Sequence, residues 1–331
     1  MANYVGTTGP DTYNGTSSND SIVGGAGNDT LNGAGGNDFV DGASGDDSLL
    51  GGDGNDTVAG DDGNDVLQGE AGDDLMFGEA GNDFLRGNLG NDALSGGAGQ
   101  DTLNGGNGDD TLDGGVITDA INYSDLNVVS YAGMGGTGDT GPGVNVNLQT
   151  GVATDGLGGT DTLSNFMSVV GSDYGDTILG TADWSFEIFD GGLGDDTIDG
   201  GELSATSSNR VTYFTASGAV QVDLSTNSAT GAAGNDTLLN INHVQGSKYG
   251  DLLVGSDSEF TETFMGRAGN DTIDGGGGLD IARYDFRSTR TSAPTRPSTA
   301  SARSRRTRRC LSASTRCSTS KACAAPASTT R

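Results

Sequence analysis

Aspartate recurs every nine residues through the first third of the chain, thirteen times in succession. Carboxylates can act as acid–base groups or as ligands of hard cations, and calcium takes about six to eight oxygen ligands. Turn preference alone would accept asparagine at these positions as readily as aspartate. Asparagine never replaces it, so the charge itself is needed. The thirteen residues are Asp11, Asp20, Asp29, Asp38, Asp47, Asp56, Asp65, Asp74, Asp83, Asp92, Asp101, Asp110 and Asp119.

Each aspartate is the sixth residue of a nine-residue phrase that first begins at Gly6. Position 1 is glycine in every copy, position 4 is glycine except at Ser18 and Ile117, and position 8 is always apolar. Glycine permits positive φ and close backbone approach, which tight stacked loops need at positions 1 and 4. We therefore expect a six-residue polar loop and a three-residue strand in each copy, with position 8 pointing inward.

The phrase Gly-Gly-Ala-Gly-Asn-Asp-Thr-Leu-Asn at 24–32 resembles the glycine-rich nonapeptide of RTX, or haemolysin-type calcium-binding, proteins. The resemblance implies an all-β fold, a parallel β-roll or β-solenoid with calcium between its turns. Two copies would make one turn, so thirteen copies give about six and a half turns and about 30 Å of solenoid. Loops eighteen residues apart in sequence would then lie on the same edge.

The resemblance also implies that aspartates eighteen residues apart share a Ca²⁺ ion, about eight ions in the ten most regular copies at 24–113. One buried apolar side chain per copy contributes about 1.5–3 kcal/mol, whereas ordering nine backbones costs roughly 9–18 kcal/mol. We therefore expect the roll to fold only on binding calcium. The expected ligands are Asp29, Asp38, Asp47, Asp56, Asp65, Asp74, Asp83, Asp92, Asp101 and Asp110, with Asp176, Asp196, Asp251 and Asp271 in later glycine loops.

After Asn122 the strict period fails, and a larger unit of mixed β-structure begins. Glycine loops with a position-6 aspartate then return on either side of an eleven-residue copy, whose Phe189 we expect to point inward. The same arrangement recurs once more, with Phe264 in the place of Phe189. We expect a thirteen-repeat roll at 1–122, mixed β modules that end in shorter roll segments at 123–201 and 202–286, and a tail at 287–331.

The tail differs sharply in composition from the rest of the chain. It contains eleven Lys or Arg residues, no Asp or Glu, and all three cysteines. Arg303 to Arg309 could form a polyanion-binding patch, or the tail could be a disordered basic segment that folds back onto the acidic body. We favour a third interpretation, a frameshift, because a GC-rich gene read out of frame gives such an Ala, Ser, Thr and Arg mixture.

Charge and targeting signals limit the possible partners. Residues 1–286 contain 46 acidic and five basic residues, which leaves a net charge of −41 and disfavours nucleic acid and anionic membranes. No apolar run is long enough to span a membrane, and the repeats begin too early to leave room for a cleaved signal peptide. With the resemblance, this predicts a secreted, extracellular bacterial protein whose partners are calcium ions and a type I secretion apparatus that reads a C-terminal signal.

We expect no catalytic residues and no enzymatic activity. His243 is the only histidine, and the chain has neither a His-Glu-x-x-His zinc motif nor a Gly-x-Ser-x-Gly elbow. Trp184 is expected to pack in an enlarged loop. The predicted function is calcium binding by repeats that fold outside the cell. The alternatives are a calcium-dependent structural or adhesive protein of the cell surface or matrix, and the repeat portion of a secreted enzyme that lacks its catalytic domain.

Overall fold

The computed structural model describes residues 3–117, 126–133, 143–156, 158–182, 186–204 and 207–283, together with the backbone of a short strand at 316–317. Every regular element in these ranges is a β-strand, which confirms the all-β fold class. Asp119, Trp184 and the basic segment Arg303 to Arg309 lie outside the described residues.

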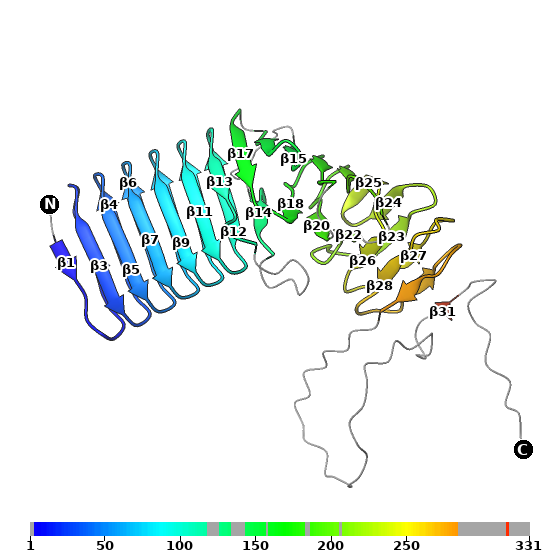
Figure 1. Ribbon diagram of the computed structural model, residues 1–331, viewed down its shortest axis with the longest axis horizontal. Coiled ribbons are helices and arrows are strands. Elements are labelled where there is room, and N and C mark those ends of the chain that lie inside the picture. Colours follow the sequence, from blue (N-terminus) through cyan, green and yellow to red (C-terminus); the bar gives the residue numbers. More distant parts are fainter. Residues whose placement is uncertain are drawn as a thin grey trace, which may run out of the picture.

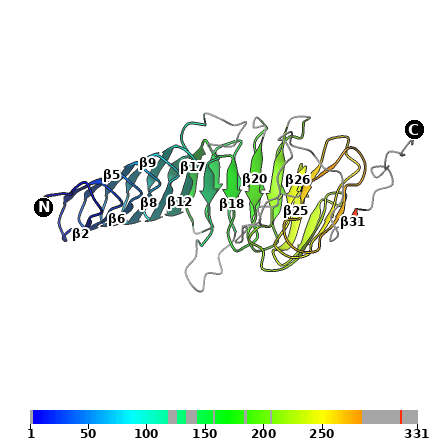
Figure 2. The ribbon, with the colours of Figure 1, turned by 90° about the horizontal axis from the view of Figure 1, so that it is seen from below.

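The first part of the chain forms a flattened stack of turns in which strands alternate between two sheets (Figures 1 and 2). All neighbours in each sheet are parallel and are offset by eighteen residues, as in the pair Leu31↔Leu49. Two copies per turn are thus confirmed. The first sheet contains β1 (Asn3–Val5), β3 (Ser21–Ala26), β5 (Phe39–Ser44), β7 (Thr57–Asp62), β9 (Leu75–Ala80), β11 (Ala93–Ala98) and β13 (Thr111–Asp113). The second sheet contains β2 (Thr12–Asn14), β4 (Thr30–Gly35), β6 (Ser48–Asp53), β8 (Val66–Ala71), β10 (Phe84–Leu89) and β12 (Thr102–Asn107).

The strands of the roll are longer than the sequence predicted. Strands β3 to β12 each span six residues, positions 7 to 9 of one copy and 1 to 3 of the next. The expectation of three-residue strands and six-residue loops was therefore wrong here. Glycine at position 1 therefore lies within the strand, where the lack of a side chain lets the neighbouring strand approach. Only positions 4 to 6 form the turn.

Positive φ angles also fall partly elsewhere than expected. Position 4 has them, as at Gly27 (109°), but the second site is position 2, as at Ala34 (80°) and Glu70 (80°). Position 1 needs glycine for a different reason. A Cβ on Gly33 would collide with the Asp38 carboxylate and with the Gly51 carbonyl of the next turn.

The core of the roll is a single row of apolar side chains between the two sheets. As predicted, position 8 points inward, and every such residue from Ile22 to Leu112 is at most 2% exposed. Position 7 faces solvent, as at Leu75, which is 40% exposed. One inward side chain per copy leaves a thin core.

Beyond the roll the second sheet continues as a simple parallel stack. Its strands are β14 (Val128–Ser130), β18 (Ser168–Val170), β20 (Glu187–Asp190), β22 (Asn209–Thr212), β26 (His243–Gln245), β28 (Thr263–Met265) and β30 (Ile281–Ala282). Phe189 and Phe264 are inward and buried, as predicted.

The first sheet gains antiparallel strands in two places. β17 pairs in parallel with β13, β16 lies antiparallel between β17 and β15, and β15 pairs in parallel with β19. β23, β24 and β25 repeat this arrangement between β21 and β27. The further strands of this sheet are β15 (Asn145–Asn147), β16 (Val152–Thr154), β17 (Thr160–Ser164), β19 (Thr177–Leu179), β21 (Thr197–Asp199), β23 (Val220–Asp223), β24 (Ser228–Gly231), β25 (Gly234–Leu239), β27 (Leu252–Val254), β29 (Thr272–Asp274) and β31 (Arg316–Cys317).

The two sheets consequently differ in size, with eighteen strands in the first and thirteen in the second. The axis of the solenoid bends where the antiparallel strands are inserted, so that the roll and the remaining part run in different directions (Figure 1). The division into domains at 1–122, 123–201, 202–286 and 287–331 stays a prediction.

Candidate metal centres

The position-6 aspartates form two ladders, one along each edge of the roll. In each step the backbone N–H of one aspartate donates to Oδ1 of the aspartate eighteen residues later, at 2.7 Å for Asp29 to Asp47 and 2.8 Å for Asp92 to Asp110. The structure brings together all eight predicted pairs in this way. The stacking explains the ladder, because the parallel register places equivalent loops directly above one another.

The second carboxylate oxygen, Oδ2, has no hydrogen-bond partner along most of both ladders. Burying a carboxylate oxygen without compensation is strongly unfavourable, and a hard cation would satisfy it. These side chains are only 1–4% exposed. The residues with a buried, unbonded Oδ2 are Asp29, Asp38, Asp47, Asp56, Asp65, Asp74, Asp83, Asp92 and Asp110.

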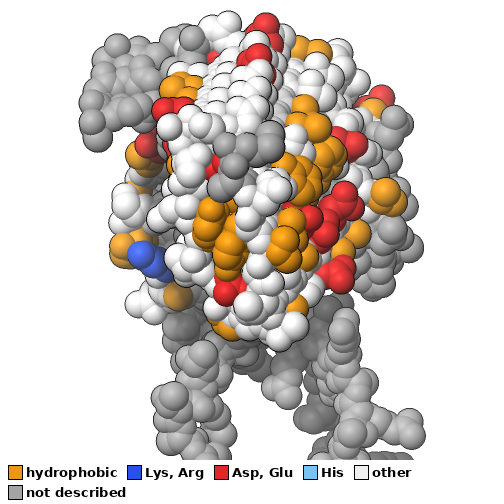
Figure 3. Space-filling model, turned by 90° about the vertical axis from the view of Figure 1, so that its left-hand side faces the viewer, with side chains coloured by type: hydrophobic (Ala, Val, Ile, Leu, Met, Phe, Trp, Pro, Cys, Tyr) orange, Lys and Arg blue, Asp and Glu red, His pale blue; other side chains and the backbone are white. Residues whose placement is uncertain are grey.

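The electrostatics of the ladders match this geometry. Burial raises the pKa of Asp47 to about 6 and that of Asp56 to about 7, and the charges of neighbouring aspartates raise both further. Burial likewise raises the pKa of Asp92 to about 7, with Asp110 as the strongest charged neighbour. The N-terminal end of the molecule also shows more acidic than basic side chains (Figure 3).

The first copies differ from the interior ones. Thr16 donates to Oδ2 of Asp20 from its backbone N–H at 2.6 Å and from its hydroxyl at 2.9 Å. Thr7 makes the same two hydrogen bonds to Oδ2 of Asp11. The hydroxyl and amide thus bond the oxygen that has no hydrogen-bond partner in most ladder aspartates from Asp29 to Asp110. The predicted ligand set begins at the same residue.

Carboxylates alone would not complete a metal site. The described part of the chain contains no group of three or more His, Cys, Asp or Glu residues arranged to hold an ion. The remaining ligands would be backbone carbonyls, which calcium accepts. The stacked loops supply them, since a Cβ on Gly45 would collide with the carbonyl oxygen of Gly27 in the preceding turn. The donor set therefore fits calcium.

Comparison with known families gives the same result. The family of RTX calcium-binding nonapeptide repeats matches residues 5–40, 14–49, 35–67, 50–85, 59–94, 86–116, 185–202 and 256–283. The chain contains RTX calcium-binding nonapeptide repeats. No curated protein matches it.

Each RTX ladder ends differently at the first mixed module. The Asp110 N–H donates to Oδ1 of Asp161 at 3.2 Å, and the Tyr131 hydroxyl donates to Oδ2 of Asp161 at 3.0 Å. The other ladder ends where the Asp101 N–H donates to the Asn127 amide oxygen at 3.0 Å. A tyrosine hydroxyl and a neutral amide thus take over where the repeats stop.

The second module repeats the tyrosine ending. The Asp196 N–H donates to Asp236 at 3.2 Å, and the Tyr213 hydroxyl donates to the second oxygen of Asp236 at 2.8 Å. Sequence reasoning missed Asp161 and Asp236 as ladder members. Each stands two residues before an inward leucine, the spacing of positions 6 and 8, and that signal could have revealed them.

The four predicted ligands outside the roll fall into different environments. Ser172 and Ser247 donate their N–H and hydroxyl groups to Asp176 and Asp251, all at 2.7 Å. Asp196 instead has an unbonded, buried Oδ2, and burial raises its pKa to about 8. The fourth, Asp271, accepts the Asp251 N–H at 3.0 Å.

Two glutamates also occupy ladder positions that sequence reasoning missed. Glu187 and Glu262 each stand two residues before an inward phenylalanine. The two extra residues of the eleven-residue copies hid them from a nine-residue count. They belong to one row, the edge column, which prolongs the Asp101 ladder through successive strands of the second sheet: Asp101, Asn127, Met167, Glu187, Asn209, Asn242, Glu262 and Asp280.

His243 begins β26, as expected for a strand residue, and its ring lies 3.0 Å from the Ser208 hydroxyl through Nδ1. Burial lowers its pKa to about 4, and the charges of Arg210 and Arg283 lower it further. A base this weak removes few protons from serine at neutral pH. The Ser208–His243 pair therefore does not resemble a nucleophile with its general base.

The described residues include no helix that is long and apolar enough to cross a membrane.

Proposed function

We propose that the RTX repeats of this chain bind calcium through their position-6 aspartates, and that calcium binding drives the roll to fold. The observation that supports this most directly is the row of buried carboxylate oxygens without hydrogen-bond partners. About eight ions would occupy the ten regular copies, one between each pair of successive aspartates on an edge. The proposed ligands are the ten aspartates from Asp29 to Asp110, with Asp176, Asp196, Asp251 and Asp271 beyond the roll.

The physical argument is one of compensation. Without a cation, folding would bring rows of carboxylates out of water and next to each other, which the raised pKa values of Asp56 and Asp92 express. A divalent cation between two turns would neutralise a pair of stacked aspartates and would be coordinated by Oδ2 of each. It would also bridge loops that are otherwise joined by few apolar contacts. The thin core makes this contribution decisive for stability.

A calcium titration of the full chain tests the proposal. Far-ultraviolet circular dichroism should show little β-structure in calcium-depleted buffer and a cooperative gain of β-structure at millimolar calcium. Equilibrium dialysis should then count about eight ions in the roll, with magnesium at equal concentration as the control. Full β-structure without calcium, or no bound calcium, would overturn the proposal.

The setting that suits such a protein is outside a bacterial cell, where calcium is about millimolar, in the range that extracellular modules bind. We propose that the chain belongs to the type I secreted class and folds after export. RTX repeats are typical of such proteins. A secretion assay should recover the protein in the medium only when the matching export channel is present.

We propose a non-catalytic role, since the described chain is a repeat solenoid and its one histidine is a weak base. A structural or adhesive protein of the cell surface is the alternative that the stiff acidic solenoid favours. Calcium-dependent self-association or cell attachment would support that alternative. The repeat portion of a secreted enzyme is a further alternative, which coding sequence for a catalytic domain next to this chain would support.

A further inference from the structure

In the edge column, three of the seven steps have the ladder hydrogen bond from a backbone N–H to the side-chain oxygen of the next residue. These bonds run from Asp101 to Asn127 at 3.0 Å, from Asn209 to Asn242 at 2.8 Å and from Glu262 to Asp280 at 3.3 Å. Elsewhere in the column backbone carbonyls accept, as where the Asn242 N–H donates to the Asn209 carbonyl at 3.2 Å. At Glu187 the N–H instead donates to the Ser208 carbonyl at 3.1 Å. The Asn209 amide oxygen is therefore left out of the ladder.

At the step from Glu187 to Asn209, two buried oxygens have no hydrogen-bond partner, Oε2 of Glu187 and Oδ1 of Asn209. The two residues are direct partners in the parallel register of β20 and β22, which places their Cα atoms about 4.8 Å apart and their side chains on the same face. Glu187 is 0% exposed and Asn209 is 1% exposed. The pair is thus sealed from water that could otherwise satisfy both atoms.

The remaining contacts define which atoms are unsatisfied. Nδ2 of Asn209 donates to the carbonyls of Gly200 at 2.6 Å and Asn240 at 2.9 Å, so the amide orientation is determined. The other oxygen of Glu187, Oε1, accepts the Thr181 N–H at 2.8 Å. Two unbonded oxygens, one of them anionic, require a donor or a cation.

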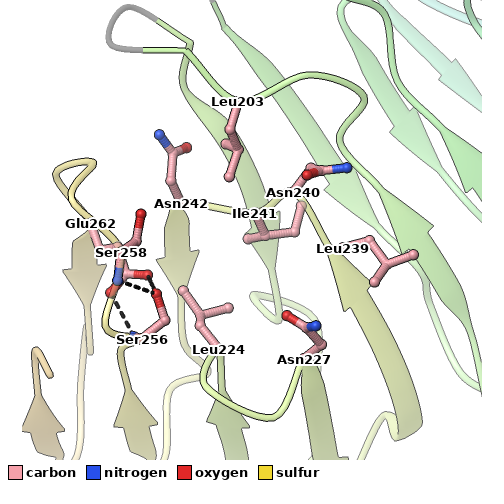
Figure 4. Close-up of a pocket in the computed structure, with 10 residues that line it drawn as sticks. All are labelled: Leu203, Leu224, Asn227, Leu239, Asn240, Ile241, Asn242, Ser256, Ser258 and Glu262. Carbon is pink, nitrogen blue, oxygen red and sulfur yellow. Dashed lines mark hydrogen bonds between the residues drawn. The ribbon is translucent and has the colours of Figure 1, made fainter. Parts of the chain in front are cut away.

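The equivalent glutamate of the second module shows the contrast. Ser256 donates its N–H to Oε2 of Glu262 at 2.9 Å and its hydroxyl to Oε1 at 2.6 Å, beside a pocket of about 250 Å³ (Figure 4). Both oxygens of Glu262 are thus bonded. The first module differs from the second at the very atoms that a cation would bind.

We propose that Glu187 Oε2 and Asn209 Oδ1 are two ligands of a cation site in the edge column, between the first and the second mixed module and beyond the thirteen-repeat roll, with calcium as its ion. The donors are hard oxygens, and one carries a negative charge, which calcium prefers over softer ligands. Burial raises the pKa of Glu187 to about 7, so ion binding would replace a proton near neutral pH. Backbone carbonyls and water would complete the coordination. Calcium binding at this site can be tested separately from calcium binding by the aspartate ladders.

Terbium luminescence tests this site on the full chain, because Tb³⁺ replaces calcium and emits when a nearby tryptophan is excited. Trp184 is the only tryptophan and precedes Glu187 by three residues, a chain length that spans at most about 10 Å. Wild-type protein should give tryptophan-excited emission that excess calcium removes. Glu187→Gln, which keeps the shape of the side chain and removes its charge, should lose most of that emission.

Asp190→Asn is the matched control, because Asp190 lies in the same strand but its oxygens accept hydrogen bonds from Gly192 and Thr215. This variant should keep the emission of the wild type. Circular dichroism in saturating calcium reports the ladders independently and should be unchanged in Glu187→Gln. Absent emission in the wild type, or equal emission in Glu187→Gln, would overturn the proposal even if the ladders bind calcium.

Discussion

At the scale of the residue, charge and hydrogen bonding can be separated within a single aspartate. In Asp65→Asn the amide oxygen can still accept the Asp47 N–H, which lies 2.8 Å from Asp65 Oδ1, but it offers calcium no charge. Asp65 borders the proposed sites shared with Asp47 and Asp83. We expect a loss of about one or two bound ions and a higher calcium midpoint for folding, measured by dialysis and circular dichroism.

Asp11→Asn is the control for this substitution, because Thr7 already bonds the second oxygen of Asp11. Calcium stoichiometry should hardly change in that variant. Equal losses in the two variants would show that the unbonded oxygens do not mark the ion sites.

The raised pKa values predict how the calcium-free chain responds to acid. The folded-state pKa values of Asp47, Asp56 and Asp92, about 6 to 7, lie above the ordinary 3.8, so the folded state binds protons more tightly than the unfolded state. Stability in calcium-depleted buffer should rise as pH falls from about 8 to 5. Circular dichroism should show β-structure increasing over this range, and a steady decrease would contradict the prediction.

Protons and calcium would compete for the same carboxylates. The calcium midpoint for folding should therefore be higher at pH 6 than at pH 8, because more of these groups are protonated at pH 6. Asp11, whose pKa is lowered by hydrogen bonds from Thr7, should contribute nothing to this shift.

At the scale of the element, each strand contributes one side chain to the core. Leu67 is fully buried, so Leu67→Ala should destabilise the calcium-loaded roll by about 2–5 kcal/mol. Leu75, at position 7, is 40% exposed, and Leu75→Ala should change stability by about 0.5 kcal/mol or less. Thermal unfolding in saturating calcium measures both. Similar effects would mean that the strand face was wrongly assigned.

The element scale also shows how far sequence reasoning reaches. The nine-residue period predicted the inward position 8, and together with the resemblance to RTX repeats it predicted the two-copy turn and the aspartate pairs. The six-residue strands were missed because glycine at position 1 was assigned to a loop, whereas its missing side chain lets adjacent strands approach. The positive φ angles at Ala34 and Glu70 could not be predicted from the sequence, because the stacked turn imposes that conformation on residues that do not prefer it.

In the candidate sites, the regular part was predictable and the exceptions were not. Thr16 beside Asp20 and Tyr131 beside Asp161 depend on contacts between residues that no period relates. Glu187 and Glu262 follow the same spacing to an inward residue as the aspartates do, but two inserted residues shift their place in the count. Asn209 could not be identified at all from the sequence, because its role depends on a missing hydrogen bond.

At the scale of the whole molecule, the basic tail contains none of the proposed ligands, although its strand β31 pairs with β29. All proposed ligands lie before residue 283, and residues 287–331 contribute no acidic group. A variant that ends at residue 286 should keep the calcium midpoint and stoichiometry of the full chain. A clear change in either quantity would show that the tail takes part in folding or binding.

The additional strands in the first sheet suggest that the length and the curvature of the solenoid have separate origins. Each additional nonapeptide pair lengthens both sheets equally, by about 4.8 Å, and so extends a straight rod. Each antiparallel insertion adds two strands to one sheet only, about 10 Å on one side, and so acts as a wedge that curves the rod. Reach is thus encoded by the repeat count and curvature by the number of insertions, so that duplication or loss of either unit alters one without the other.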